Sequence, residues 1–293
     1  MGRGHYGAFD DQEVVRAIHA ALDAGVTLYD TAAVYGNGYS EELLGKALGR
    51  RRKDVIVVTK GGLQWNPETK RNDRNSSKAW LRKCLEDSLK RLNTDYIDLY
   101  LIHWPDESRP MQEPMEAFQE FKREGKIRYG GVSNFSPAQM AECLRHFPII
   151  CNQVGYHLFD RRPEPAIFPF CRDNGLGVMV YGPLAHGLLT GTMTRDTKFG
   201  EDDWRRQGMA FGQPLFQGEH FLRNLEIVDK LKTIAARRGR TVAQLAVAWV
   251  LSNPVVSVAL VGTRKPEEIL ENIKAAQWRL TEEDKKEIEA AFK

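Results

Sequence analysis

The chain has 293 residues, 42% of them hydrophobic and 28% charged, a balance that excludes a disordered protein and supplies a large hydrophobic core. Its net charge of +3, from 42 basic and 39 acidic residues, is too small to indicate a nucleic-acid partner. No apolar run approaches membrane-spanning length and residues 1–11 contain no signal-peptide core, so we expect a cytoplasmic protein without a membrane partner.

Strand-like apolar segments alternate with amphipathic, helix-like segments along most of the chain. The expected strands cover residues 27–31, 55–60, 97–103, 127–132, 149–154, 178–181 and 256–261. The expected helices lie near residues 11–25, 40–50, 77–92, 111–124, 136–147, 163–174, 222–238 and 241–252. Repeated strand-then-helix order favours a parallel α/β architecture. No linker, repeat or low-complexity stretch divides residues 1–293, so we expect one domain.

Local signals mark two helix starts and one long connection. Ser40, which precedes two glutamates, predicts an N-cap, and Ser136 before Pro137 predicts an N-cap followed by proline at the first helical position. Residues 191–220 interrupt the strand–helix rhythm with a segment rich in glycine, threonine, aspartate and aromatic residues. Connections of that length are usually functional, so we expect a long active-site loop there.

Four ionisable side chains lie at or just beyond the ends of successive strand-like segments. Asp30 and Tyr35 occur in TLYDTAAVYG, Lys60 in VIVVTKGG and His103 in IDLYLIHWPD. In a barrel of parallel strands, these ends meet in one pocket. An acid, a phenol, an amine and an imidazole gathered there can deliver a proton to a carbonyl oxygen. Taken singly, each residue also fits a structural role in a turn or at a solvated strand end.

Other reactive side chains show no comparable pattern. Asp95 and Asp98 are alternatives to Asp30 as the carboxylate. The four cysteines form no CxxC pair and have no histidine at zinc spacing, so we expect reduced, mostly buried thiols and no metal site. Among the remaining histidines, His157 either lines the pocket or packs in the core, and we assign His186 no chemistry.

Seven motifs occur in an order that is known from one enzyme family. They are YDTAAVYGNGYSEELLGKAL, VVTKGG, DLYLIHWPD, GKIRYGGVSNF, NQVGYHLFDRR, YGPLAHGLLTG and VGTRKPEEILEN. From about residue 7 to the C-terminus, the chain resembles the aldo-keto reductase superfamily, in the bacterial branch related to potassium-channel β subunits. Any one motif is weak support, whereas seven in the family's order are not explained by coincidence.

The resemblance implies a (β/α)8 TIM barrel that binds NADPH in an extended form without a Rossmann domain. The absence of GxGxxG after any expected strand agrees with this. A closed barrel of this type has eight strands, but only seven are expected here. The eighth should precede the helix near 11–25, and residues 1–9 contain no strand-like run. We therefore expect the first barrel strand to be missing or truncated.

The resemblance also implies a role for each of the four ionisable residues. Tyr35 would be the general acid, although a free tyrosine has a pKa of about 10. The ammonium group of Lys60 would lower that pKa, and Asp30 would pair with Lys60 and orient it. His103 would form a hydrogen bond with the carbonyl oxygen and help to place the substrate. NADP(H) would supply the hydride that reduces an aldehyde or ketone to an alcohol.

Further motifs resemble the family's cofactor contacts. Ser133, Asn134 and Gln153 correspond to residues that hold the nicotinamide carboxamide, and Tyr181 corresponds to the aromatic residue that stacks on its ring. The expected contacts with the pyrophosphate and the adenosine end are Gly182, Pro183, Leu184, Ala185, Gly187, Gly262, Thr263, Arg264, Glu268, Glu271 and Asn272.

The adenosine end indicates which cofactor is used. Arg264 lies just before a helix that is expected to start near Pro266, and a guanidinium there suits the adenosine 2′-phosphate. This arrangement favours NADP over NAD. Glu268 departs from the family's pattern, because relatives often have glutamine or arginine at this position.

Three hypotheses about function follow. Trp65 and Trp104, with parts of 191–220, are expected walls of a pocket for small aldehydes and ketones. The leading hypothesis is an NADPH-dependent aldehyde or ketone reductase. The alternatives are a cofactor-binding regulatory or partner-binding module with little turnover, and a truncated, inactive barrel. A homo-oligomer in which a neighbouring chain fills the barrel's gap is a further alternative.

Overall fold

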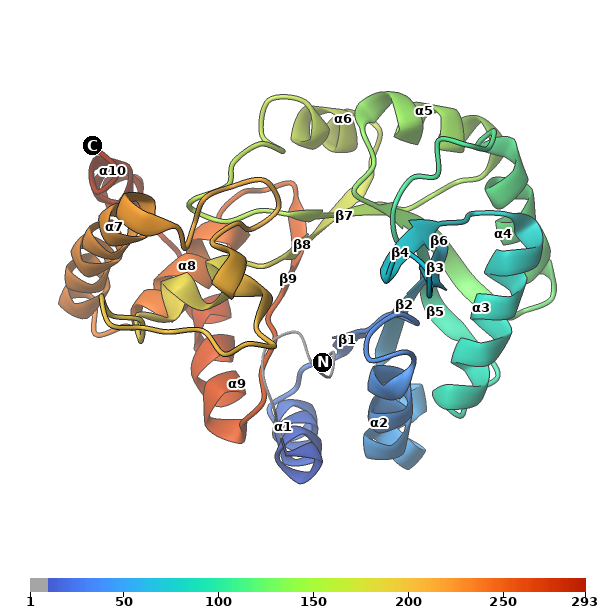
Figure 1. The fold of residues 1–293 in the computed structure, drawn as a ribbon, viewed down its shortest axis with the longest axis horizontal. Coiled ribbons are helices and arrows are strands. Elements are labelled where there is room, and N and C mark those ends of the chain that lie inside the picture. Colours follow the sequence, from blue (N-terminus) through green and yellow to red (C-terminus); the bar gives the residue numbers. More distant parts are fainter. Residues whose placement is uncertain (1–9) are drawn as a thin grey trace.

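Parallel strands form the centre of the molecule in the computed structural model, which describes residues 10–293 (Figure 1). Seven strands lie side by side in the order β1-β2-β5-β6-β7-β8-β9, and every neighbouring pair is parallel. They are β1 (Leu28–Asp30), β2 (Ile56–Gly61), β5 (Ile97–Ile102), β6 (Ile127–Ser133), β7 (Cys151–Gly155), β8 (Gly177–Tyr181) and β9 (Val256–Leu260). All seven strands predicted from the sequence are confirmed.

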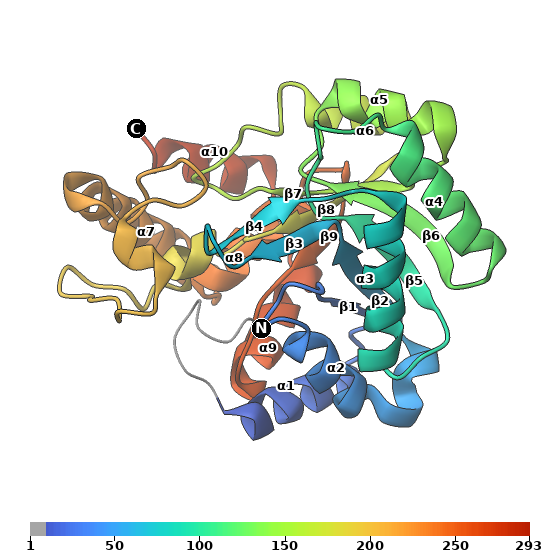
Figure 2. The ribbon, with the colours of Figure 1, turned by 45° about the vertical axis from the view of Figure 1, so that its right-hand side comes forward.

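Helices surround this sheet on its outer side (Figures 1 and 2). They are α1 (Asp11–Asp23), α2 (Tyr39–Leu48), α3 (Lys78–Arg91), α4 (Gln112–Arg123), α5 (Pro137–His146), α6 (Ile167–Asp173), α7 (Gly218–Arg237), α8 (Val242–Leu251), α9 (Pro266–Asn272) and α10 (Glu282–Ala290). The eight predicted helices and the one starting near Pro266 are confirmed, with α7 beginning four residues earlier than the expected 222. The α/β barrel architecture is therefore also confirmed.

A β-hairpin and the last α-helix were not predicted. An antiparallel hairpin of β3 (Leu63–Asn66) and β4 (Arg71–Arg74) follows β2 directly. Its residues are mostly polar and exposed, so they show no apolar strand signal. Helix α10 begins with a capping box in which Thr281 and Asp284 bond each other's backbone N–H groups. That Thr-x-x-Asp spacing is a recognisable helix-start signal, although the short helix after it has only a weak apolar periodicity.

The two predicted helix caps have different outcomes. Ser136 is confirmed as the N-cap of α5, because its Oγ accepts from the N–H of Gln139 while its own N–H donates to the Gln139 side chain. The prediction for Ser40 is wrong, because the N-cap of α2 is Gly38, two residues earlier, and Ser40 lies inside the helix. Ser40 is buried and its Oγ instead accepts a hydrogen bond of 2.9 Å from Thr31.

The sheet remains open between β1 and β9 in the part of the chain that the structure describes. Within residues 10–293, no strand pairs with the outer edge of either. Helices α1 and α9 pack against each other across this opening. The residues expected to lack the eighth strand, 1–9, are outside the described part. Inside the barrel, a small apolar cluster includes Val58, Leu101 and Met179.

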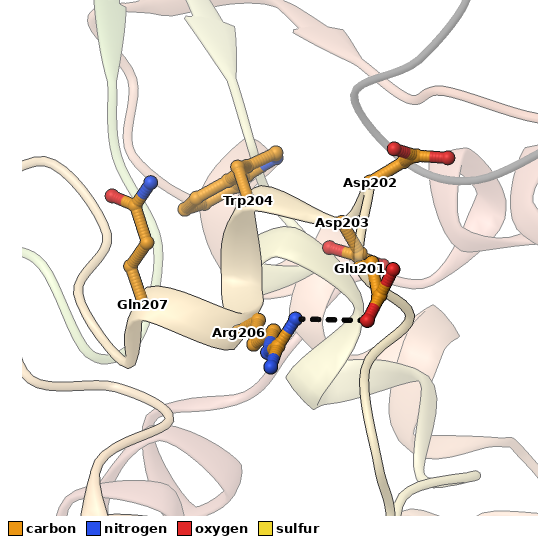
Figure 3. A pocket seen from close by; sticks show the side chains of 6 residues that line it. All are labelled: Glu201, Asp202, Asp203, Trp204, Arg206 and Gln207. Atoms are coloured by element: carbon orange, nitrogen blue, oxygen red, sulfur yellow. Dashed lines mark ion pairs between the residues drawn. The ribbon is translucent and has the colours of Figure 1, made fainter.

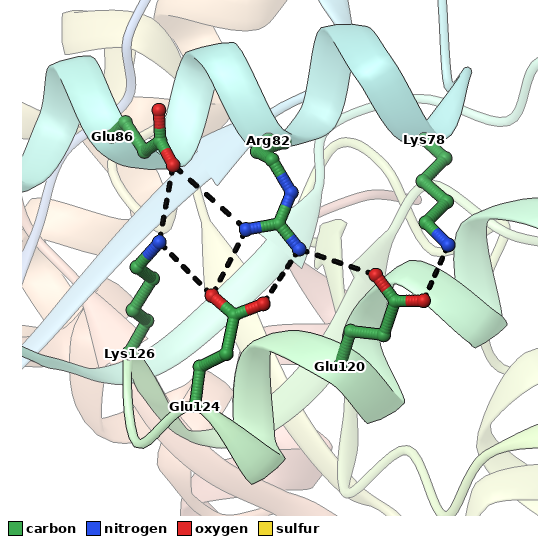
Figure 4. A network of polar contacts seen from close by, with 6 residues as sticks. All are labelled: Lys78, Arg82, Glu86, Glu120, Glu124 and Lys126. Atoms are coloured by element: carbon green, nitrogen blue, oxygen red, sulfur yellow. Dashed lines mark hydrogen bonds and ion pairs between the residues drawn. The ribbon is translucent and has the colours of Figure 1, made fainter.

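A network of ion pairs connects α3 and α4 on the outer surface (Figure 4). Arg82 bonds Glu124 at 2.7 Å and Glu120 at 3.2 Å, and Lys126 bonds Glu124 at 2.9 Å. The hydrogen bonds from Arg82 and Lys126 lower the pKa of Glu124 to about 2. These side chains are partly exposed, so each pair adds little free energy of folding, and the network mainly sets the relative position of the two helices.

Replacing Phe118 by alanine should strongly destabilise the protein. Phe118 is fully buried in α4, where its ring contacts those of Tyr100, Phe121 and Phe147 at centroid distances of 5.6–6.3 Å. The cavity left by Phe118→Ala should cost about 3–5 kcal/mol in urea unfolding. Tyr129→Ala, at a position 53% exposed, is the control and should cost no more than about 0.5 kcal/mol. Equal losses in the two variants would contradict this account of the core.

Candidate active site

The four ionisable residues singled out in the sequence come together at the carboxyl end of the sheet. Asp30 ends β1, Lys60 is the penultimate residue of β2, and His103 follows β5 directly. Tyr35 lies in the connection between β1 and α2. Because β1, β2 and β5 are neighbouring parallel strands, their carboxyl ends present these side chains on one side of the barrel.

Lys60 is at the centre of this group. It is only 1% exposed, and its Nζ donates to Asp30 Oδ1 at 2.6 Å and to the carbonyl oxygen of Thr31 at 2.9 Å. The ammonium group also lies 5.2 Å from the centroid of the Tyr35 ring. Burial lowers the pKa of Lys60, but the charge of Asp30 and the contact with Tyr35 outweigh it and raise the pKa above its ordinary value. Lys60 is therefore a permanently charged group at neutral pH.

Lys60 lowers the pKa of Tyr35, as predicted from the sequence, but the net pKa of Tyr35 lies above its ordinary value. Burial raises it most, Lys60 lowers it, and Asp30 raises it. The sequence argument included the attraction of the ammonium for the phenolate but not the cost of burying a charged phenolate. At neutral pH, Tyr35 consequently retains its proton, and a protonated phenol is the form that can act as an acid.

His103 contacts Tyr35 edge to face, with the ring centroids 5.7 Å apart. Burial, and then the charge of Lys60, lower the pKa of His103 to about 3, so the imidazole is neutral at physiological pH. Its Nδ1 is buried and has no hydrogen-bond partner among the described residues. A neutral imidazole has one donor nitrogen and one acceptor nitrogen, which suits it to bind a carbonyl oxygen without adding charge.

The alternative carboxylate Asp98 is engaged elsewhere. Its Oδ2 lies 2.8 Å from Arg52 Nη2 and accepts from the N–H of Val57 at 2.9 Å, near the amino ends of β2 and β5. Asp30 is therefore the carboxylate that contacts Lys60. Its second oxygen, Oδ2, accepts from Gln153 Nε2 at 2.8 Å.

Polar side chains from β6, β7 and β8 extend the site. Asn134 Nδ2 donates to the carbonyl oxygen of His103 at 3.1 Å and to Ser133 Oγ at 3.0 Å, while its Oδ1 accepts from the Tyr181 hydroxyl at 2.9 Å. Asn134 has a φ of 65°, a left-handed conformation that asparagine tolerates better than most residues. The structure thus brings Ser133, Asn134, Gln153 and Tyr181 together beside the four ionisable residues.

The backbone after β8 has an unusual conformation. Gly182, Ala185, His186 and Gly187 all have positive φ, between 46° and 101°. The segment from Ala185 to Thr190 forms a short 3₁₀ helix that is interrupted at His186 and Gly187. Pro183 and Leu184 lie between them, so the whole predicted pyrophosphate segment is one tight loop at the carboxyl end of β8.

The residues predicted for the adenosine end follow β9, but two of them bond neighbouring protein groups. Glu268 accepts from the N–H of Arg264 at 2.8 Å and from the hydroxyl of Thr263 at 3.1 Å, which fixes the turn before α9. Glu271 accepts from the hydroxyl of Thr241 at 2.7 Å. Asn272 is buried, whereas Gly262 has open space where a Cβ would lie.

The two tryptophans predicted as pocket walls lie in different surroundings. Trp65 belongs to the hairpin strand β3 and is 51% exposed. Trp104 is partly buried directly after His103, and the guanidinium of Arg74 lies 5.5 Å from its ring centroid. Both stand beyond the carboxyl ends of β2 and β5, although only Trp104 is adjacent in sequence to one of the four ionisable residues.

An aromatic cluster that sequence reasoning missed connects the 191–220 loop to this site. Phe211 stacks on His186 with centroids 5.3 Å apart and lies 5.6 Å from Tyr181, and Trp204 contacts His186 at 5.1 Å. Arg205 Nη1 donates to the carbonyl oxygen of His186 at 3.0 Å. The aromatic content of the loop was the only available signal, and it did not show which rings would meet.

The same loop contains a small polar pocket of its own (Figure 3). Its lining comes from the loop alone and includes Trp204 and an ion pair of 3.9 Å between Arg206 and Glu201. None of the four ionisable residues lines it. We therefore place the candidate active site at Lys60 and its neighbours.

Sequence comparison relates the whole chain to one family, because the model of the aldo/keto reductase family matches residues 1–293. The chain belongs to the aldo/keto reductase family. It is 41% identical to aldo-keto reductase YhdN of Bacillus subtilis, over 98% of this chain and 86% of that protein. The NADH-specific methylglyoxal reductase of Escherichia coli is 36% identical, over 95% of this chain and 87% of its own length. These relatives are reductases, and the chain is an oxidoreductase by family.

The relation to potassium-channel β subunits is also confirmed. A probable voltage-gated potassium channel subunit beta of rice is 36% identical, over 91% of this chain and 82% of that protein. Among solved structures, the glycerol dehydrogenase of Gluconobacter oxydans has a TM-score of 0.89 and 41% identity, over 98% of this chain and 88% of that one. An aldo-keto reductase of Klebsiella pneumoniae in complex with NADPH has a TM-score of 0.75 and 33% identity, over 96% of this chain and 85% of that one.

Within residues 10–293, no three histidine, cysteine, aspartate or glutamate side chains gather in a way that could hold a metal ion. No helix in that range is both long and apolar enough to span a bilayer. All four cysteines are free and buried, as predicted.

Burial of neutral His103 should make the stability of the protein depend on pH. Its pKa is about 3 in the folded protein and about 6.5 when unfolded, so the unfolded state binds the extra proton between these values. The stability that comes from keeping His103 neutral is therefore complete above pH 6.5 and is lost as the pH falls toward 3. The free energy of unfolding, measured with urea, should fall between pH 7 and pH 5. In His103→Gln this fall should be about 1–2 kcal/mol smaller than in the wild type.

His220 provides the control, because it is exposed. The variant His220→Gln should show the same difference between pH 7 and pH 5 as the wild-type protein. If His103→Gln also behaved like the wild type, the neutral, buried state assigned to His103 would be incorrect.

Proposed function

We propose that this chain is an NADP(H)-dependent reductase of small aldehydes and ketones, acting in the cytoplasm as one domain, with Tyr35 as the proton donor. The observation that supports it most is the buried Lys60 ammonium, which lies between the Asp30 carboxylate and the Tyr35 ring. A charged lysine beside a protonated phenol is suited to stabilise the phenolate that forms when the proton leaves. Neutral His103 stands on another side of the same phenol ring.

The residues present fit a nicotinamide dinucleotide. Asn134 and Gln153 supply amide donors and acceptors beside Tyr35, Lys60 and Asp30, and would hold the carboxamide. The positive-φ loop after β8 allows backbone to approach the pyrophosphate closely, and Arg264 would hold the adenosine 2′-phosphate. When bound, the cofactor supplies the hydride that reduces the carbonyl carbon. The complex of the Klebsiella relative with NADPH supports the choice of NADP(H).

The side chains then account for the proton. The hydroxyl of Tyr35 donates its proton to the carbonyl oxygen as that oxygen gains negative charge. The Lys60 ammonium stabilises the resulting phenolate, and Asp30 keeps Lys60 charged and oriented. His103 donates a hydrogen bond to the same oxygen and remains neutral. A proton from solvent then restores Tyr35. Trp65, Trp104 and the 191–220 loop would enclose the substrate.

Tyr35→Phe tests the assignment of the acid. The variant keeps the ring and its contacts but has no proton to donate, so turnover of an aromatic aldehyde with NADPH should fall at least about 100-fold. NADPH binding, followed by cofactor fluorescence, should be retained. Tyr129→Phe removes a hydroxyl from an exposed tyrosine and should leave turnover unchanged. Full activity in Tyr35→Phe would refute the assignment.

The similarity to a potassium channel subunit gives a second candidate function, a module that binds the cofactor but turns over little. The same experiment separates the two functions. Wild-type protein that binds NADPH tightly but reduces no aldehyde would favour the module.

Arg264 should determine the preference for the phosphorylated cofactor. Removing a charge-assisted contact with Arg264→Ala should weaken NADPH binding by about 10- to 100-fold and leave NADH binding almost unchanged. Arg279→Ala, which removes an exposed arginine outside the predicted site, is the control and should change the binding of neither cofactor. The comparison of NADPH with NADH is informative because one relative, the methylglyoxal reductase of Escherichia coli, is specific for NADH. Equal losses for both cofactors would mean that Arg264 does not contact the 2′-phosphate.

A further inference from the structure

A fully buried carboxylate lies behind the candidate active site. Glu41, in the first turn of α2, has an exposed fraction of 0%. Its Oε1 accepts from the hydroxyl of Thr59 at 2.6 Å, and its Oε2 accepts from Arg91 Nη1 at 3.0 Å. Burying a charge costs free energy unless the charge is paired and hydrogen-bonded. The Glu41 carboxylate therefore strongly favours the arrangement in which both Thr59 and Arg91 bond it.

One partner of Glu41 adjoins Lys60. Thr59 is buried in β2 and directly precedes Lys60. Because side chains alternate along a strand, Thr59 is directed to the opposite face from Lys60. The hydrogen bond from Thr59 to Glu41 therefore fixes this part of β2 from the outer side of the barrel, while Lys60 bonds Asp30 on the inner side.

The other partner holds the connection that contains Tyr35. Arg91, the last residue of α3, packs so closely on Gly38 that a Cβ there would lie 2.3 Å from the Arg91 Nε. Gly38 caps α2, and the N–H of Ser40 donates to the carbonyl oxygen of Tyr35 at 3.2 Å. The first turn of α2, which contains Glu41, is thus joined to the backbone of Tyr35.

We propose that Glu41 is a positioning residue, which fixes the Tyr35 connection relative to Lys60 through its bonds with Thr59 and Arg91. The inference rests on the proposed function, in which Lys60 stabilises the Tyr35 phenolate. Neither Glu41, Thr59 nor Arg91 touches the reacting groups. Their effect is on the separation of Tyr35 and Lys60, and small errors of placement reduce catalysis strongly.

The sharpest test compares two substitutions at Thr59. Thr59→Val keeps the shape of the side chain but removes the hydroxyl that bonds Glu41, whereas Thr59→Ser keeps the hydroxyl. Thr59→Val should lower kcat about 10- to 100-fold with little change in the KM for NADPH, and Thr59→Ser should restore most of the kcat. Asp284→Asn is the matched control. It removes another buried carboxylate that bonds an arginine, Arg238, but on α10, far from the site.

A second readout does not need turnover. Titration of Tyr35 by ¹³C-tyrosine NMR, assigned with Tyr35→Phe, reports the influence of the charged groups around its ring, Lys60 and Asp30, with Tyr181 and the neutral His103 also nearby. If Thr59→Val moves Lys60 away, the pKa of Tyr35 should rise further, because the attraction that lowers it weakens. Asp284→Asn should leave this titration unchanged.

The outcomes separate the two claims. Loss of kcat and a raised Tyr35 titration in Thr59→Val, both recovered in Thr59→Ser, would support the positioning role. A variant that loses only thermal stability, as Asp284→Asn should, would overturn it. Wild-type protein without turnover would refute the proposed function, while the NMR titration would still decide the role of Glu41. If Thr59→Val does not fold, Arg91→Lys replaces it, since Arg91 is partly exposed and its loss is less disruptive.

Discussion

The candidate site depends on one buried ion pair, between Lys60 and Asp30. An ammonium group with 1% exposure is stable only if a carboxylate and further acceptors compensate for the loss of water. Asp30 and the carbonyl oxygen of Thr31 meet this need, and both belong to the end of β1 or the residue after it. The pair therefore fixes the relative position of β1 and β2. The positions of the side chains around the pair are fixed with it.

Burial and the charge of Lys60 together determine the state of the neighbouring groups. Burial is the larger cause that keeps His103 neutral, and the cost of a second cation beside Lys60 adds to it. Tyr35 remains protonated, because the attraction of Lys60 for a phenolate is smaller than the cost of burying one. The site therefore contains a protonated phenol, a neutral imidazole and a fixed cation. The phenol can donate one proton, and the cation can stabilise the phenolate that is left.

The sequence was sufficient for the seven barrel strands and for the meeting of the four ionisable residues, because apolar runs mark buried parallel strands and their ends share one side of a barrel. It was not sufficient for energies and long-range partners. The pKa of Tyr35 depends on burial, which no local pattern gives. Ser40 looked like a helix cap because Glu41 followed it, yet both side chains are buried. Ser40 bonds Thr31, the residue after β1, and Glu41 bonds Thr59 of β2. The contact of Phe211 with Tyr181 joins positions thirty residues apart, and nothing near either residue indicates it.

The left-handed backbone of Asn134 restricts how this site can change during evolution. Most side chains are strained at a φ of 65°, and only glycine and a few short polar residues adopt it easily. Glycine would relieve the strain but would leave the Tyr181 hydroxyl and the carbonyl oxygen of His103 without their amide partner. The backbone conformation and the side-chain hydrogen bonds therefore each favour asparagine at position 134, for independent reasons. Gradual substitution at this position has few viable intermediates, and new substrate preferences are more accessible through the loops around it.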